Sequence, residues 1–155
     1  MSLGDALNDS LELMGRILRR WGFSEKDIII YTALLMSPPG PMTMKEISEK
    51  TGFSLSTVSQ SLNNLIRYYM VKPEKRGRVR VFTAVPMFYE LFLNQPVEML
   101  DKEVIPLKQR LLELKDKMPE LRDRIDLILS NLSNMECVLN EIIRIKNNNT
   151  CMNSR

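Results

Sequence analysis

The stretch between Thr43 and Val85 changes its hydrophobic periodicity twice, and few folds accommodate such a change. Thr43 and Glu46 form a capping-box pattern, which predicts that a short helix begins there, and Gly52 predicts its end. Ser54 is then the expected N-cap of a second helix. The apolar positions of this second helix recur at steps of three and four residues: Leu55, Val58, Leu62, Leu65 and Tyr69.

The residues after the second helix show a period of two, behind a basic turn at residues 75–78, which predicts a β-hairpin. The alternating positions are Val79, Val81, Thr83 and Val85. Helix, tight turn, helix and basic hairpin follow one another in this order in winged helix-turn-helix domains, where the second helix can lie in the DNA major groove. Ser48 is small enough to let the first helix pack on the second. The stretch therefore predicts a mainly α fold, in which a three-helix bundle is closed by a β-hairpin wing.

Short hydroxyl and amide side chains cover the outer face of the second helix, and such groups can exchange hydrogen bonds with base edges and phosphates. We expect a recognition helix over residues 54–69 in the major groove, and a wing over residues 75–80 on the DNA backbone or in the minor groove. The expected DNA-binding residues are Thr43, Lys45, Ser54, Ser56, Thr57, Gln60, Asn63, Asn64, Arg67, Lys75, Arg76, Arg78 and Arg80. Each feature alone is more typical of a solvated helix face or a soluble sheet edge. Their combination in this order favours DNA binding.

Basic residues are concentrated in the same segment. Residues 40–85 contain eight basic and three acidic residues. By contrast, residues 1–39 contain four basic and five acidic residues, and residues 86–155 contain ten basic and eleven acidic residues. The excess of positive charge therefore lies where nucleic acid is expected to bind, although the net charge of the chain is only +3.

The composition favours a mainly helical protein and argues against several classes of function. Hydrophobic residues make up 44% of the 155 positions, but aromatic residues only 6%. The chain contains no histidine, which removes the commonest general base and metal ligand at neutral pH. Cys137 and Cys151 are too few for a disulfide framework or a zinc site, which favours a reducing compartment. An enzyme is thus the least expected class, and we expect neither a metal nor a cofactor.

No run of residues reaches the ~20 apolar positions that a membrane-spanning helix needs. The first residues also lack the basic and apolar regions of a secretory leader. We therefore expect a soluble, cytoplasmic protein without a membrane partner.

Two helices are expected before the rigid loop at residues 37–41. Residues 5–20 form the first, with apolar side chains at steps of four and three: Leu7, Leu11, Met14, Leu18 and Trp21. This face can pack on its own domain or on a second subunit, and the sequence leaves both possibilities open. Ser24 is the expected N-cap of the next helix, residues 25–36, which is apolar on nearly every side and therefore predicted to be buried.

The second half of the chain carries a long heptad pattern. Fourteen successive positions alternate steps of three and four residues, and all are apolar: Val97, Leu100, Val104, Leu107, Leu111, Leu114, Met118, Leu121, Ile125, Ile128, Leu132, Met135, Leu139 and Ile142. We call these fourteen positions the seam. Such a pattern indicates coiled-coil-like packing.

Prolines are expected to divide the helices that carry the seam. Pro86 should begin a helix that Pro96 interrupts, and Pro106 can mark either a first turn or a kink. Pro119 should break the seam, because proline inside a helix costs ~3 kcal/mol. A second long helix would then run over residues 120–146, either in line with the first or folded back on it.

The apolar stripes of these helices exceed what one small winged domain can cover, so a homodimer is favoured over a monomeric helical hairpin. The expected interface residues are Leu11, Leu18, Leu100, Leu107, Leu111, Leu114, Leu121, Ile125, Ile128, Leu132 and Leu139. The expected regions are an N-terminal helix at 1–23, a DNA-binding domain at 24–85, a dimerisation region at 86–147 and a disordered tail at 148–155.

The order of elements resembles the MarR-like transcriptional regulators, and most closely their GbsR-type branch. The resemblance covers most of the chain and is sharpest in PMTMKEISEKTGFSLSTVSQSLNNLIRYYMVK and in the KRGR wing. It implies a dimeric DNA-binding regulator in which Arg76 and Arg78 reach phosphate or the minor groove. Some relatives sense small molecules, choline among them. A cationic ligand could be held by Phe88, Tyr89, Phe92 and Trp21, although aromatic residues at helical spacing are more often core.

We therefore expect a homodimeric, sequence-specific DNA-binding transcription regulator, a repressor, that has no catalytic activity. The sequence leaves open whether a small-molecule effector binds to it. Two recognition helices related by a dyad predict a palindromic site with half-sites ~10 bp apart. The alternative is a winged helix used as a protein-interaction scaffold, since a fold alone does not decide function. The concentrated positive charge favours the regulator.

Overall fold

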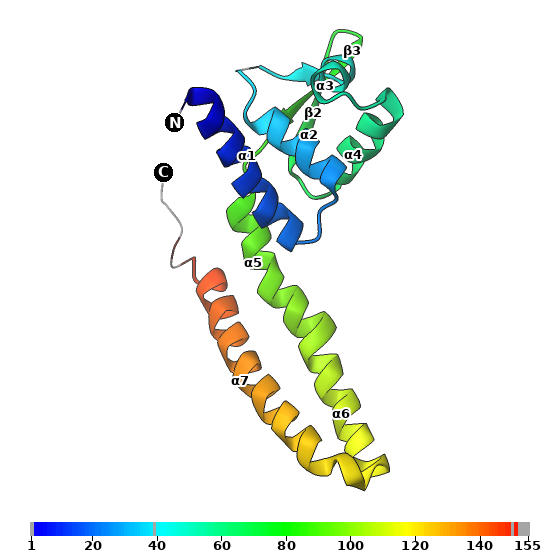
Figure 1. The fold of residues 1–155 in the computed structure, drawn as a ribbon, viewed down its shortest axis with the longest axis vertical. Coiled ribbons are helices and arrows are strands. Elements are labelled where there is room, and N and C mark those ends of the chain that lie inside the picture. The colour runs from blue at the N-terminus through cyan, green and yellow to red at the C-terminus, as the bar shows by residue number, and fades with distance from the viewer. Residues whose placement is uncertain (1, 39, 150, 152–155) are drawn as a thin grey trace. The chain divides into compact units, whose positions relative to one another are not determined.

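The structure is a computed structural model that describes residues 2–38, 40–149 and 151 (Figure 1). The chain divides into two compact units, residues 1–87 and residues 88–155. The first unit contains, in order, α1 (Leu3–Arg20), α2 (Glu25–Leu35), β1 (Met42–Thr43), α3 (Met44–Thr51), α4 (Leu55–Arg67), β2 (Val71–Arg76) and β3 (Val79–Ala84). The N-terminal helix therefore belongs to the same unit as the helix-turn-helix.

Side-chain caps begin the helices of the first unit. The hydroxyls of Ser2, Ser24, Thr43 and Ser54 each accept a hydrogen bond from the backbone N–H three residues further on. The caps of α1 and α3 are complete capping boxes, because the acidic side chain at the third helical position also accepts from the capping residue. The predicted capping box of α3 is thus present.

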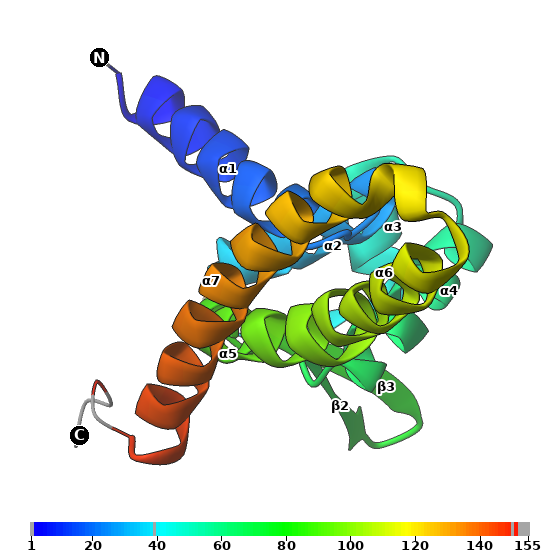
Figure 2. The same cartoon turned by 90° about the horizontal axis from the view of Figure 1, so that it is seen from below.

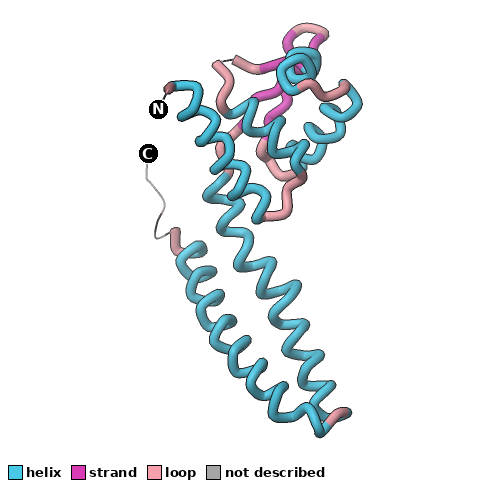
Figure 3. The backbone as a smooth tube through the Cα atoms, viewed as in Figure 1, coloured by secondary structure: helices cyan, strands magenta, loops and turns pink. Residues whose placement is uncertain are grey.

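The sheet has three antiparallel strands in the order β1-β3-β2, which are coloured magenta in Figure 3. Strands β2 and β3 form the predicted hairpin, in which Arg76 pairs with Val79 across the turn. Strand β1 was not predicted: Met42 pairs with Phe82, and Thr43 with Val81. Two residues are too few to show any periodicity, so this strand has no signal in the sequence.

Helix α2 is the centre of the core of the first unit. It contacts α1, α3, α4 and β3, and its Ile30 and Tyr31 are fully buried. The Tyr31 hydroxyl donates to the carbonyl oxygen of Val85 at 2.6 Å and accepts from the N–H of Met87 at 3.1 Å. The side chain of Tyr31 therefore ties the chain that leaves β3 to α2.

An exposed ion pair joins the end of α1 to the start of α2. Arg19 donates from Nε and from a terminal nitrogen to the two carboxylate oxygens of Glu25. These hydrogen bonds lower the pKa of the Glu25 carboxyl below its usual value and, with the negative charge of Glu25, raise the pKa of Arg19.

The second helix of the predicted pair ends earlier than residue 69. Helix α4 ends at Arg67, and Tyr69, expected on its apolar face, is 79% exposed with φ +61°. Met70 is fully buried instead. Leu55 is likewise wrong as a core position, being 53% exposed. A positive φ at Tyr69 turns the chain, so that the next side chain and not this one reaches the core.

The second unit is a helical hairpin (Figure 2). Its elements are α5 (Phe88–Met99), the π-helical segment η1 (Leu100–Val104), α6 (Ile105–Lys117), the 3-10 turn η2 (Pro119–Leu121) and α7 (Arg122–Asn147). The break at Pro119 is confirmed, and the chain folds back, so that α7 contacts both α5 and α6. Pro106 lies in the first turn of α6.

The predicted interruption at Pro96 is wrong. Helix α5 continues through Pro96, which is buried. Proline removes one backbone hydrogen bond, and the packing of α5 against α7 can offset that loss. The π-helical segment η1 follows four residues later and joins α5 to α6 without a break.

Polar contacts link the two arms of the hairpin. Lys108 Nζ lies 2.6 Å from Glu136 Oε2, and Lys115 Nζ lies 2.5 Å from Asp126 Oδ1. Near the open end, Lys146 Nζ donates to Asn94 Oδ1 at 3.1 Å. These contacts keep α7 in register with α5 and α6.

The hairpin covers only part of the seam. Leu100, Val104, Ile125 and Leu139 are buried. Five further seam positions are between 36% and 45% exposed: Leu107, Leu114, Met118, Ile128 and Met135. The chain thus leaves an apolar surface along α6 and α7.

Four residues expected at a dimer interface are covered within the chain itself. Leu18 is fully buried in the first unit, and Leu100, Ile125 and Leu139 are at most 7% exposed in the second. A heptad pattern cannot distinguish packing within a chain from packing between chains. The other expected interface residues are half-buried or exposed.

In the described part of the chain, no helix is long and apolar enough to cross a membrane. Of the expected tail, Asn148, Asn149 and Cys151 lie in turns, and the other positions lie outside the described residues.

Candidate nucleic-acid interface

Helices α3 and α4 are joined by a short turn whose geometry is fixed by hydrogen bonds. Gly52 adopts φ +78°, and its N–H donates to the carbonyl oxygen of Ser48 at 2.9 Å. The Ser48 hydroxyl donates to the carbonyl oxygen of Phe53 at 2.5 Å. A left-handed glycine after the helix is the expected C-terminal signal, and the small Ser48 holds the turn as well as permitting close packing.

The exposed face of α4 carries polar side chains along its whole length: Ser56, Gln60, Asn63 and Arg67. Their spacing of four, three and four residues places them on one side of the helix. This strip can therefore enter a major groove as a unit. Ser54 and Thr57 lie at its start, but their hydroxyls already bond to each other at 3.0 Å, in addition to the cap.

Asn64 lies differently from the other expected DNA contacts. Its Nδ2 donates to Oδ2 of Asp27 at 2.6 Å, and Asp27, on α2, is only 6% exposed. The amide therefore holds α4 against α2, and the prediction that it faces DNA does not agree with this contact. Sequence spacing placed Asn64 beside Asn63, but the two side chains point to different sides of the helix.

The wing is basic, and its cations form no ion pairs among the described residues. Lys75, Arg76, Arg78 and Arg80 are all exposed, as is Lys45 at the start of α3. None of these five has a carboxylate within 4.0 Å among the described residues, whereas the exposed Arg16, Arg19 and Arg144 do. Gly77 makes the two-residue turn with φ +65°. The wing thus presents positive charge that no neighbouring group neutralises.

Two of the clefts on the first unit bear on function. One lies between the starts of α3 and α4 and the wing, and includes four apolar residues that were not expected at an interface: Met44, Leu55, Val79 and Phe82. Their signal in the sequence is weak, because an apolar residue at helical or strand spacing is usually assigned to the core.

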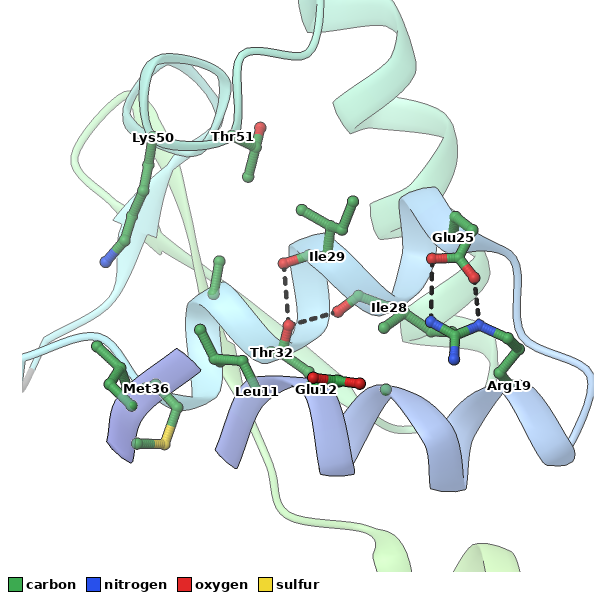
Figure 4. A pocket seen from close by; sticks show the side chains of 13 residues that line it. Leu11, Glu12, Arg19, Glu25, Ile28, Ile29, Thr32, Met36, Lys50 and Thr51 are labelled. Atoms are coloured by element: carbon green, nitrogen blue, oxygen red, sulfur yellow. Dashed lines mark hydrogen bonds and ion pairs between the residues drawn. The ribbon is translucent and has the colours of Figure 1, made fainter. Parts of the chain in front are cut away.

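The other cleft lies between α1, α2 and α3 and encloses about 460 Å³ (Figure 4). Leu11, Ile29 and Met36 line its apolar part, and the Arg19–Glu25 pair lies at one end. The four aromatic residues proposed as a cationic-ligand cage do not line it. The described residues also contain no group of three or more cysteine, aspartate or glutamate side chains suited to a metal ion.

The first unit contains a three-helix bundle with a hairpin wing. It presents an exposed polar strip on the second helix of the helix-turn-helix, together with cations that have no acidic partner among the described residues. These features define a winged helix-turn-helix DNA-binding protein. The comparison with protein families agrees: residues 18–88 match the family described as "Sugar-specific transcriptional regulator TrmB". The protein is thus a DNA-binding transcriptional regulator with a winged helix-turn-helix domain, and its residues 18–88 are similar to the TrmB family.

Solved structures were also compared. A crystal structure described as a transcriptional regulator is 17% identical with a TM-score of 0.55, over 92% of this chain and 99% of that chain. BpsR of Bordetella bronchiseptica is 16% identical (TM-score 0.39; 86% and 94% covered), and its DNA binding is described as regulated by 6-hydroxynicotinic acid. NMB1585, a MarR family regulator from Neisseria meningitidis, is 18% identical (TM-score 0.38; 84% and 99% covered).

The first of these likenesses shows a shared fold. No curated protein sequence matches the chain. The prediction of a MarR-like winged helix-turn-helix regulator agrees with these findings, while the GbsR-type branch and the coiled coil remain predictions.

Proposed function

We propose that the protein is a homodimeric, sequence-specific repressor that acts in the cytoplasm and has no catalytic step. One observation carries the proposal: the exposed polar strip of α4 lies in the same unit as five cations that have no acidic partner among the described residues. Base edges are read by amides and hydroxyls, and phosphates are bound by cations, so the two groups supply specificity and affinity separately.

Gln60 and Arg76 test this division of roles. The duplexes that the protein prefers are first selected from a random pool. Gln60→Ala should then relax the sequence preference by ~1–3 kcal/mol at one position, because a bidentate amide–base contact is lost. Arg76→Ala should weaken all duplexes alike and reduce the salt slope of log K by about one. Fluorescence anisotropy at several salt concentrations measures both effects.

Matched controls are available in the second unit. Gln109→Ala and Arg124→Ala remove the same groups from exposed positions outside the wing and α4, and should leave binding unchanged. Equal losses on cognate and random duplex for both Gln60→Ala and Arg76→Ala would contradict the division of roles. Failure to bind heparin or any duplex at low salt would instead favour a protein-interaction scaffold.

Repression follows if the bound dimer excludes polymerase from a promoter. A template with the selected site inside its promoter should give less transcript as protein is added, and a template with a scrambled site should not. An increase in transcript would make the protein an activator.

A small-molecule effector is also proposed, and the cleft between α1, α2 and α3 supports it. Its volume lies within the range of ligand sites, and its lining is mainly apolar. The matching family is described as sugar-specific, but this lining suits an apolar body better than a sugar. A screen for compounds that release the selected duplex tests the proposal.

A further inference from the structure

The cleft beside the wing lies between the two elements assigned to DNA. It encloses about 380 Å³, and its lining residues are Thr43, Met44, Lys45, Leu55, Arg78, Val79, Arg80 and Phe82. They come from β1, the first turn of α3, the first residue of α4, the hairpin turn and β3. Whatever occupies this cleft touches the recognition helix and the wing at once.

Apolar side chains in the cleft are exposed although residues near them are buried. Leu55 is 53% exposed and Val79 is 50% exposed, whereas Val58 and Val81, on the same two elements, are at most 6% exposed. The core therefore ends before Leu55 and Val79. Two half-exposed apolar side chains in one concave site can pack on the apolar part of a ligand.

Positive charge is concentrated in the same cleft. Lys45, Arg78 and Arg80 line it, and none of the eight lining residues is acidic. The guanidinium carbon of Arg80 lies 5.3 Å from the centre of the Phe82 ring, which holds this cation beside the apolar residues. An occupant must therefore be an anion that also has apolar surface.

We propose that the cleft seats one sugar–phosphate segment of a DNA strand, namely the strand that passes between the recognition helix and the wing. Deoxyribose carbons pack on Leu55 and Val79, and the flanking phosphates bind Lys45, Arg78 and Arg80. The inference rests on the proposed function and adds Leu55 and Val79 as positioning residues. They set the register of the protein on DNA without reading a base.

Single uncharged methylphosphonate linkages, placed one at a time along the selected duplex, test the seat. At one or two adjacent linkages, the loss of the phosphate charge should weaken DNA binding by the wild type several-fold. The same linkage should weaken DNA binding by the Arg80→Ala variant less, because the methylphosphonate and the substitution remove the same contact. Leu55→Ala should weaken all duplexes alike, by about threefold to thirtyfold. The salt slope of log K should stay unchanged for Leu55→Ala, whereas it should fall by about one for Arg80→Ala, because only the second variant loses a phosphate-binding cation.

Leu13→Ala is the matched control, because Leu13 is 57% exposed on α1 and does not line the cleft. It should bind like the wild type, and circular dichroism should show that all three variants are folded. The inference would be overturned if, at every linkage, the methylphosphonate weakened binding by the Arg80→Ala variant as much as it weakens binding by the wild type. So would a Leu55→Ala variant that no longer distinguishes thymine from deoxyuridine, because Leu55 would then contact a base methyl group. A wild-type protein that binds no duplex would instead contradict the proposed function.

Discussion

Asn64 directs its amide at the buried carboxylate of Asp27. The amide nitrogen lies 2.6 Å from Oδ2 of Asp27, on α2, and this contact orients α4 on the core. Asn63, the preceding residue, is exposed. Two identical side chains at adjacent positions thus have different roles, and the difference comes from the partner that α2 supplies.

Asn64→Ala should lower the free energy of unfolding by about 1–3 kcal/mol, because it removes a hydrogen-bond donor from the buried carboxylate of Asp27. Urea unfolding measures the change. Asn63→Ala is the control, and should stay within about 0.5 kcal/mol of the wild type, as exposed substitutions usually do. If Asn64→Ala were as stable as the wild type but lost sequence preference, Asn64 would be a base contact after all.

At the scale of elements, the turn between α3 and α4 depends on a left-handed residue. Gly52 has φ +78°, and a Cβ atom built there meets nothing within 4 Å. Gly52→Ala should therefore destabilise the protein by about 1 kcal/mol through backbone strain alone. Thermal unfolding followed by circular dichroism measures this change.

Gly4→Ala is the matched control for the turn. Gly4 lies inside α1 without a positive φ, and its added Cβ would lie 3.8 Å from the Ser2 hydroxyl oxygen. Alanine is the better helix former, so this variant should be equally stable or more stable, by up to about 1 kcal/mol. An unchanged midpoint for Gly52→Ala would show that the turn does not require glycine.

The prolines show how packing decides where a helix ends. Met118, before Pro119, has φ −129° and ψ 76°, which lies outside the helical region that a following proline disfavours, and the chain reverses there. Pro96 follows the same steric rule, yet α5 continues through it. The sequence rule is identical at both positions. The difference is that Pro96 is buried inside α5, whereas Pro119 is exposed at the end of the hairpin, where the chain reverses.

At the scale of the whole molecule, the hairpin leaves seam residues that a second chain can cover. Ile128 and Met135 are 45% and 38% exposed. The double variant Ile128→Glu, Met135→Glu should dissociate the proposed dimer, because two charges per chain would then have to be buried at the interface. Sedimentation equilibrium at micromolar concentration measures the mass, and DNA affinity should fall with it, since two linked half-sites bind more tightly than one.

The control for the dimer uses exposed apolar residues of α7 outside the seam. Leu127 and Val138 are 68% and 59% exposed, so Leu127→Glu, Val138→Glu adds the same charge and should leave the mass unchanged. Dissociation by this control alone would place the interface on the other face of α7. A monomeric wild type would contradict the dimer.

Local signals in the sequence determined the helix starts after Ser24, Thr43 and Ser54, the hairpin and the position of α4, because caps, glycine and hydrophobic periodicity act over a few residues. The features that depend on contacts between distant parts of the chain were decided by the tertiary structure. Strand β1 forms because β3 offers an edge on which it can pair. The Asn64 amide is bound within the protein because Asp27 of α2 lies opposite it. Helix α5 continues through Pro96 because it is packed in the hairpin. Leu55 and Val79 have the spacing of core residues but lie in a basic cleft. Each of these outcomes depends on a partner distant in sequence, and spacing along the chain does not encode that partner.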